Sequence, residues 1–199
     1  MFTSINRKGI ARFAAILLAL STAIFGTANA AERYRPENNR WKPSTVFLQS
    51  GTGDNQTSAY ALGATWNWHW GRNFRFGYVT GYTEAAVGRW NIEHPAIGQA
   101  DYATQFGITP VLRLFPAGLD GRWFSEIGVG ANYIAPLFHT DGRRFSTQFN
   151  FGDHIAFGRI LDTEGRSSVA IRLQHFSNGG IDAPNPGQNF GQLRFSYHY

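Results

Sequence analysis

Hydrophobic and polar residues alternate with a period of two along this chain from residue 59 to the C-terminus. In the segment 123–137, Trp123, Ile127 and Val129 hold alternate positions, and Glu126 and several glycines lie between them. This alternation is typical of a β-strand, because successive side chains of a strand point to opposite faces. An eighth strand is expected near 45–52, and the pattern predicts the other seven at 60–70, 74–82, 102–114, 123–137, 145–157, 167–177 and 193–199.

A closed barrel explains why one face of nearly every segment is aromatic while the other is polar or small. A water-soluble sandwich also alternates, but it packs its apolar faces together and turns charged residues to water. A narrow membrane barrel needs a packed polar lumen and an apolar outer belt. We therefore predict an all-β fold, an eight-stranded antiparallel transmembrane β-barrel of the bacterial outer membrane. The expected outer face includes Phe74, Phe76, Tyr78, Tyr82, Phe145, Phe149 and Phe151.

The first thirty residues follow a different pattern. Three basic residues come first, an apolar run extends from Phe13 to Phe25, and Ala28-Asn29-Ala30 forms a small-x-small cleavage site. This order is typical of a secretory signal peptide, and the apolar run is too short to span a membrane. We expect residues 1–30 to be removed and 31–199 to form one barrel domain. An uncleaved anchor is the alternative.

Charge and composition narrow the range of functions. The chain has 18 Lys and Arg against 13 Asp and Glu, and three of the basic residues fall in the signal peptide, which leaves about +2 (15 minus 13). So small an excess gives no reason to expect a nucleic-acid partner. The absence of cysteine excludes disulfides and thiolate metal ligands. A barrel of this size has no room for an aqueous channel, so solute transport is not expected.

The strand at 167–177 ends in an unusual way. Val169, Ile171 and Leu173 hold its apolar face, and the same alternation then places His175 and Ser177 there. Polar side chains that face lipid lose hydration without structural benefit. One interpretation is that the strand has reached the lipid headgroups, where polar residues are harmless. The other is that the pair is catalytic.

Catalysis requires the imidazole to take the proton of the hydroxyl. Residues two positions apart on one strand are neighbours on the same face, so His175 and Ser177 are placed for this transfer. After Ser177, Asn178 offers an amide, and the glycines at 179 and 180 offer backbone N–H groups, to an oxyanion. The long connections predicted at 90–100, 138–144 and 178–189 put this strand end on the outer side of the membrane. A nucleophile that faces lipid there can attack only a molecule of the outer leaflet, which indicates lipopolysaccharide.

The segment "QHFSNGGIDAPNPGQNF" resembles the active-site segment of the lipid A 3-O-deacylase (PagL) family, which has the pattern His-x-Ser-Asn-x-Gly followed by a Pro-Asn loop. Weaker likeness extends over most of the mature chain, as in Thr80-Gly81-Tyr82 and Glu126-Ile127-Gly128-Val129-Gly130. The resemblance implies an outer-membrane esterase that removes the 3-position acyl chain of lipid A without a metal or cofactor. It also implies the roles of the residues: His175 as base, Ser177 as nucleophile, and Asn178 and Gly180 as the oxyanion region.

The third member of the implied triad departs from the family. The family's glutamate lies fourteen residues after the histidine, and that position here is Asn189. An amide oxygen can accept the imidazole N–H but cannot balance imidazolium charge, and in a serine protease such a change lowers kcat about 10⁴-fold. Asp153 is a candidate substitute acid, because antiparallel pairing would put it opposite His175. A bulge at Gly152 that turns Asp153 inward is the alternative.

Several functional alternatives stay open at this stage. A structural or adhesive barrel with a degenerate site is the competing class, and acyl transfer to an acceptor other than water is a second enzymatic one. Arg143 and Arg144, in a predicted outer loop, could meet lipid A phosphates or form a solvated charge pair. The acyl-chain preference and the oligomeric state are undetermined, and a homodimer is among the states allowed.

Overall fold

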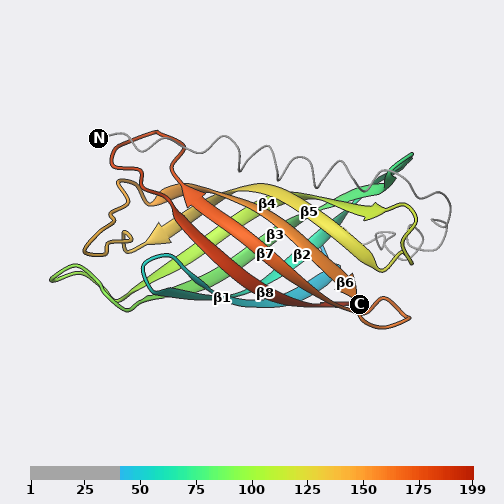
Figure 1. The fold of residues 1–199 in the computed structure, drawn as a ribbon, viewed down its shortest axis with the longest axis horizontal. Helices are drawn as coiled ribbons and strands as arrows, with labels where there is room; N and C mark the ends of the chain where they lie inside the picture. Colours follow the sequence, from blue (N-terminus) through green and yellow to red (C-terminus); the bar gives the residue numbers. More distant parts are fainter. Residues whose placement is uncertain (1–40) are drawn as a thin grey trace.

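Eight strands form a closed barrel in the computed structural model, which describes residues 41–199; the predicted signal peptide lies outside them. The strands are β1 (Thr45–Gly53), β2 (Thr57–Phe74), β3 (Gly77–Ile92), β4 (Tyr102–Pro116), β5 (Trp123–Ala135), β6 (Phe149–Ile160), β7 (Ser167–Ser177) and β8 (Gln188–His198). Each strand pairs antiparallel with the next, and β1 closes the barrel by pairing with β8 (Figure 1). The predicted eight-stranded antiparallel barrel is confirmed.

The barrel is apolar outside and polar inside. Along β7, Ile171 is 65% exposed, whereas its neighbour Arg172 is 1% exposed. Large apolar side chains cover the outside of the other strands in the same way. This is the distribution that lipid requires of a narrow barrel. Within residues 41–199, no helix is long and apolar enough to cross a membrane.

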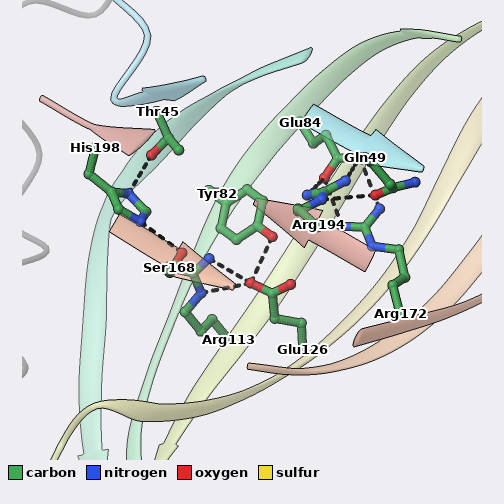
Figure 2. A network of polar contacts seen from close by, with 10 residues as sticks. All are labelled: Thr45, Gln49, Tyr82, Glu84, Arg113, Glu126, Ser168, Arg172, Arg194 and His198. Carbon is green, nitrogen blue, oxygen red and sulfur yellow. Dashed lines mark hydrogen bonds and ion pairs between the residues drawn. The ribbon is translucent and has the colours of Figure 1, made fainter. Parts of the chain in front are cut away.

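Paired charges fill the middle of the lumen (Figure 2). Arg172 and Arg194 each donate two hydrogen bonds to the carboxylate of Glu84, at distances from 2.6 to 3.1 Å. A second carboxylate, Glu126, accepts a bond of 2.7 Å from Nε of Arg113. Buried charges are tolerated only when paired and hydrogen-bonded, and each of these three arginines bonds to a carboxylate.

An aromatic cluster fills the lumen at one end. Trp90 packs against Phe138, Phe145, Phe176 and Phe190, with ring centroids 4.8 to 6.3 Å apart. The prediction that Phe145 lies on the outer face of a strand is wrong. β6 begins only at Phe149, and Phe145 lies in the preceding connection with its ring buried. An alternating pattern cannot distinguish a strand from a loop that folds back over the lumen.

The outer face predicted for the third strand is also wrong. Phe74 ends β2 and Phe76 lies in a two-residue turn, so their phase does not continue into β3. Tyr82 is 3% exposed and points into the lumen, where its hydroxyl donates to Glu126 at 2.9 Å. The phase of a strand restarts after a turn, and a tyrosine hydroxyl prefers a polar partner when buried.

The connections at the two ends of the barrel differ in length. Residues 54–56, 93–101, 136–148 and 178–187 lie at one end, and 75–76, 117–122 and 161–166 lie at the other. Figure 1 shows the longer loops together and the C-terminus at the opposite end. The prediction that the long connections share one end is confirmed, and we call this the long-loop end.

Candidate active site

The outer face of β7 ends in His175 and Ser177 at the long-loop end. Leu173 precedes them on this face, and both polar side chains are half-buried. Between them, Phe176 points into the lumen and is 1% exposed. The alternation predicted for this strand therefore continues through its last residue, and it places the imidazole and the hydroxyl on the outside.

Asn189 on β8 holds the imidazole. His175 and Asn189 are partners in the β7–β8 register, and Nδ1 of the histidine lies 2.7 Å from Oδ1 of the asparagine. An amide oxygen can only accept, so Nδ1 carries the proton and donates it. The other ring nitrogen, Nε2, is then the unprotonated and basic one, which is the tautomer a general base needs.

Asp153 on β6 lies opposite His175 from the other side. The β6–β7 register pairs Gly152 with Phe176 and Asp153 with His175, and it runs without a bulge. The pairing predicted from sequence is confirmed, and the alternative of an inward-turned Asp153 is wrong. Among the described residues no hydrogen bond joins this carboxylate to the imidazole, whose bonded partner is Asn189.

Asp54 is a site residue that the sequence reasoning missed. It follows β1, and its Oδ2 accepts a bond of 2.9 Å from Nδ2 of Asn189. Nη1 of Arg143 lies 3.0 Å from the same oxygen and also donates to the carbonyl of Gly187 at 3.0 Å. Partial burial acts to raise the pKa of Asp54, but the hydrogen bonds from Asn189 and Arg143 outweigh it and lower that pKa. Pairing the first strand with the last would have revealed this contact.

Arg143 has partners within the protein, Asp54 and Gly187, which the sequence did not predict. Its guanidinium joins the connection 136–148 to the β1–β2 turn and to the β7–β8 loop. The contact of Arg143 and Arg144 with lipid A phosphates stays a prediction.

Asn178 organises the loop after β7. It is 2% exposed, its amide nitrogen donates to Oγ of Ser146 at 2.9 Å and to the carbonyl of Asp182 at 2.8 Å, and its Oδ1 accepts the N–H of Gly180 at 2.9 Å. Its own backbone N–H donates to Oδ1 of Asn185 at 3.0 Å. The two groups expected to bind an oxyanion thus hold the loop in shape in the structure.

Gly187 packs directly against the imidazole. Its φ is +71°, and a Cβ built on it would lie 2.6 Å from Cε1 of His175. Any side chain here would displace the ring, so the glycine contributes to its position.

An open groove of about 740 Å³ lies over the outward faces of β5 to β8. Two rows of register partners line it. The polar row runs Asp153, His175, Asn189, with Asp54 next to it, and the apolar Val129 precedes Asp153 in the register; the apolar row runs Ile127, Ile155, Leu173, Gly191. The site is therefore the polar edge of an apolar groove that is open to the surroundings of the barrel.

The aromatic cluster supports the site from inside. Phe176 and Phe190 each follow a site residue directly in sequence, and both rings pack on Trp90, at 4.9 and 4.8 Å. Because strands are rigid and their side chains alternate, fixing these two rings fixes the outward neighbours His175 and Asn189. Residues 41–199 hold no cluster of three or more acidic, His or Cys side chains suited to a metal.

A closed barrel with a charged lumen, an apolar exterior and a His–Ser pair facing outward defines a membrane β-barrel that carries an enzyme-like site. Comparison with known proteins identifies it further. The sequence profile of the lipid A 3-O-deacylase (PagL) family matches residues 58–198, and the chain belongs to this family.

Two relatives and one solved structure support this membership. The lipid A deacylase PagL of Pseudomonas aeruginosa is 29% identical over 175 residues, which cover 87% of this chain and 89% of that protein. The lipid A deacylase PagL of Bordetella bronchiseptica is 38% identical over 78 residues, 39% of this chain and 42% of that protein. The crystal structure of the outer membrane enzyme PagL matches with a TM-score of 0.65 and 25% identity, over 78% of this chain and 99% of that one. The predicted fold class, an outer-membrane barrel, is confirmed.

Proposed function

We propose that this protein is a lipid A 3-O-deacylase that works as a serine esterase in the outer membrane. The observation that carries the proposal is the hydrogen bond between Nδ1 of His175 and Oδ1 of Asn189. His175 lies two residues before Ser177 on the same face of β7. The hydrogen bond leaves Nε2 as the basic nitrogen of a histidine that shares the outer, apolar face of β7 with the Ser177 hydroxyl. Lipid A is the substrate named for both relatives.

The chemistry would follow the usual order of a serine esterase. Oγ of Ser177 attacks the carbonyl carbon of the 3-O-linked ester while Nε2 of His175 takes its proton. The tetrahedral intermediate collapses, the proton passes to the sugar oxygen, and the acyl chain stays on the serine. A water then gives one proton to His175 as it attacks the acyl carbon; when the second intermediate collapses, that proton passes to Oγ, which releases the fatty acid and restores the serine.

The serine must turn for the first step. No hydrogen bond joins Ser177 to His175 among the described residues, and catalytic hydrogen bonds often tighten only in the complex with substrate. The proposed oxyanion donors need a similar change. The N–H of Gly180 would exchange Oδ1 of Asn178 for the substrate oxygen.

The site would meet its substrate in the outer leaflet. Bacterial barrels place their long loops outside, so the long-loop end would face the exterior after the signal peptide of residues 1–30 has directed export. Lipid A would approach sideways from the leaflet, with the ester near His175 and the acyl chain along the apolar row of the groove. Neither a metal nor a cofactor is needed for these steps.

Mass spectrometry of lipid A from cells that express the protein tests the proposal. We expect wild-type protein, and the control Ser50→Ala on the outer face of β1, to remove one 3-hydroxyacyl chain. Ser177→Ala should leave lipid A unchanged. If wild-type protein folds as a heat-modifiable band and lipid A still keeps every chain, the protein is a structural barrel and not a deacylase. Recovery of the missing chain on another lipid, rather than as free acid, would indicate acyl transfer.

A further inference from the structure

We propose that Asp54 is the acid of this site and acts on His175 through Asn189 as a positioning residue. The inference rests on the proposed esterase function, because it assigns the group that keeps His175 in its basic form. It replaces the two-member arrangement of His175 and Asn189 by a relay of imidazole, amide and carboxylate.

Three segments far apart in the sequence converge beside His175 of β7 to form the relay and hold its carboxylate. Asn189 comes from β8, Asp54 from the β1–β2 turn, and Arg143 from the β5–β6 connection. The contacts are 2.7 Å from His175 to Asn189, 2.9 Å from Asn189 to Asp54, and 3.0 Å from Asp54 to Arg143. The backbone N–H of Asp54 also donates to the carbonyl of Asn189 at 3.1 Å. Asp54 is thus held beside Asn189 by backbone as well as side chain.

The carboxylate decides which way the amide points. An ionised carboxylate can only accept hydrogen bonds, so the Asn189 amide must turn its NH₂ toward Asp54. Its oxygen then faces His175, and the imidazole must hold its proton on Nδ1. Without Asp54 the amide could turn over and donate to Nδ1, which would put the proton on Nε2. That tautomer cannot accept the proton of Ser177.

Arg143 limits what Asp54 adds by charge alone. The carboxylate and the guanidinium form a nearly neutral pair, which reduces their combined effect on an imidazolium. Asp54 therefore acts mainly by fixing the tautomer. The relay should support catalysis by His175 less than a carboxylate bonded directly to the imidazole would. It should support catalysis more than an asparagine that is not itself bonded to a carboxylate.

Asp153 provides a matched comparison. It faces His175 from β6 and carries the same charge, but the two are not joined by a hydrogen bond in the described part of the chain. Asp153→Asn removes a nearby charge and leaves the relay intact. Asp54→Asn removes a charge and puts at position 54 an amide that can donate as well as accept, so the orientation of the Asn189 amide is no longer fixed.

Nitrogen-15 NMR of the histidine side chains determines the tautomer of His175 whether or not the protein is active. The sample is the full barrel in lipid nanodiscs, at a pH where His175 is neutral. His175→Gln identifies the signal. We expect the Nδ1–H tautomer in wild-type protein and in Asp153→Asn, and a mixture of both tautomers in Asp54→Asn. The Nε2–H tautomer in wild-type protein would overturn the proposal without any variant, and so would a spectrum of Asp54→Asn identical to wild type.

Turnover of purified lipid A supplies the second measurement. Asp54→Asn should lower kcat by up to about tenfold with little change in KM, because part of the protein keeps the Nδ1–H tautomer; this is far less than the about 10⁴-fold of an acid-to-amide change in a protease. Adding Asn189→Glu to Asp54→Asn should restore much of the loss, because the new carboxylate accepts the Nδ1 proton directly. Lack of any rescue would contradict the relay.

If wild-type protein released no acyl chain, the proposed esterase function would fail, while the tautomers of His175 would still test the relay. Wild-type release with an unaffected Asp54→Asn would reject the relay alone.

Discussion

His175 on β7 and Asn189 on β8 face each other in register, with Nδ1 and Oδ1 2.7 Å apart on the outer surface of the barrel. An amide therefore occupies the place where the family resemblance implies a glutamate. Because this amide is itself bonded to Asp54, the departure from the family pattern need not leave the histidine without an acid.

Asn189 should matter more than Asp153. Asn189→Ala removes the one side-chain hydrogen bond that His175 makes within residues 41–199, whereas Asp153→Asn removes a charge that makes no bond to the imidazole there. We expect Asn189→Ala to lower kcat by about 10²-fold to 10⁴-fold and Asp153→Asn to lower it less than tenfold. Steady-state release of acyl chain from lipid A measures both. The reverse order would assign the acid to β6.

Gly187→Ala should damage catalysis and leave the barrel intact. The new methyl group would lie 2.6 Å from Cε1 of His175, so the ring must move. Gly98→Ala is the matched control, because Gly98 also has a positive φ but has open space around a Cβ. We expect a drop in kcat for Gly187→Ala alone, since a displacement of about 1 Å can cost 10²-fold. Equal activity in the two variants would show that the imidazole is not held against this glycine.

Gly191→Leu should narrow the groove. Gly191 ends the apolar row beside Leu173, and a Cβ there meets nothing within 4 Å, so a side chain fits without strain and projects into the groove. We expect a higher KM for lipid A with long acyl chains, and a smaller effect with short ones. Ala64→Leu, on the outer face of β2, is the control. Unchanged kinetics with both substrates would mean that the acyl chain lies elsewhere.

Trp90→Ala should loosen the support of the site. The ring packs on Phe176 and Phe190 inside the barrel, and loss of a buried aromatic side chain costs about 3 to 5 kcal/mol. We expect Trp90→Ala to unfold in detergent at a lower urea concentration than wild type does. The mobility of the folded and unfolded bands on a gel measures the transition. Trp70→Ala, at an exposed position, should unfold like wild type. A wild-type midpoint for Trp90→Ala would contradict the role of the cluster.

The alternation of hydrophobic and polar residues predicts which side chains of a strand face outward, but only within that strand. The alternation of β7 is local, so it predicted that His175 and Ser177 face outward with the leucines. The phase of β3 was predicted wrongly, because it was carried across the turn that begins after Phe74. Period two holds within a strand and says nothing about the next one.

The contact between Asp54 and Asn189 lies beyond any local pattern. It depends on closure of the barrel, which pairs Gly53 with Phe190 and so brings the next residue, Asp54, beside Asn189. The first and last strands have no connecting turn from which a register could be counted. The sequence therefore predicted the outward placement of His175 and Ser177, the proposed base and nucleophile, and it missed the carboxylate of the proposed relay.

Labelling of the purified barrel with a long-chain alkyl fluorophosphonate, which forms a covalent bond with an activated serine, tests the central claim most directly. Mass spectrometry of the intact protein and its peptides gives the number and position of adducts. We expect one adduct on Ser177, none in Ser177→Ala, and greatly slowed labelling in His175→Ala. Labelling of Ser177→Ala at the wild-type rate, or acyl release by that variant, would contradict catalysis by this serine.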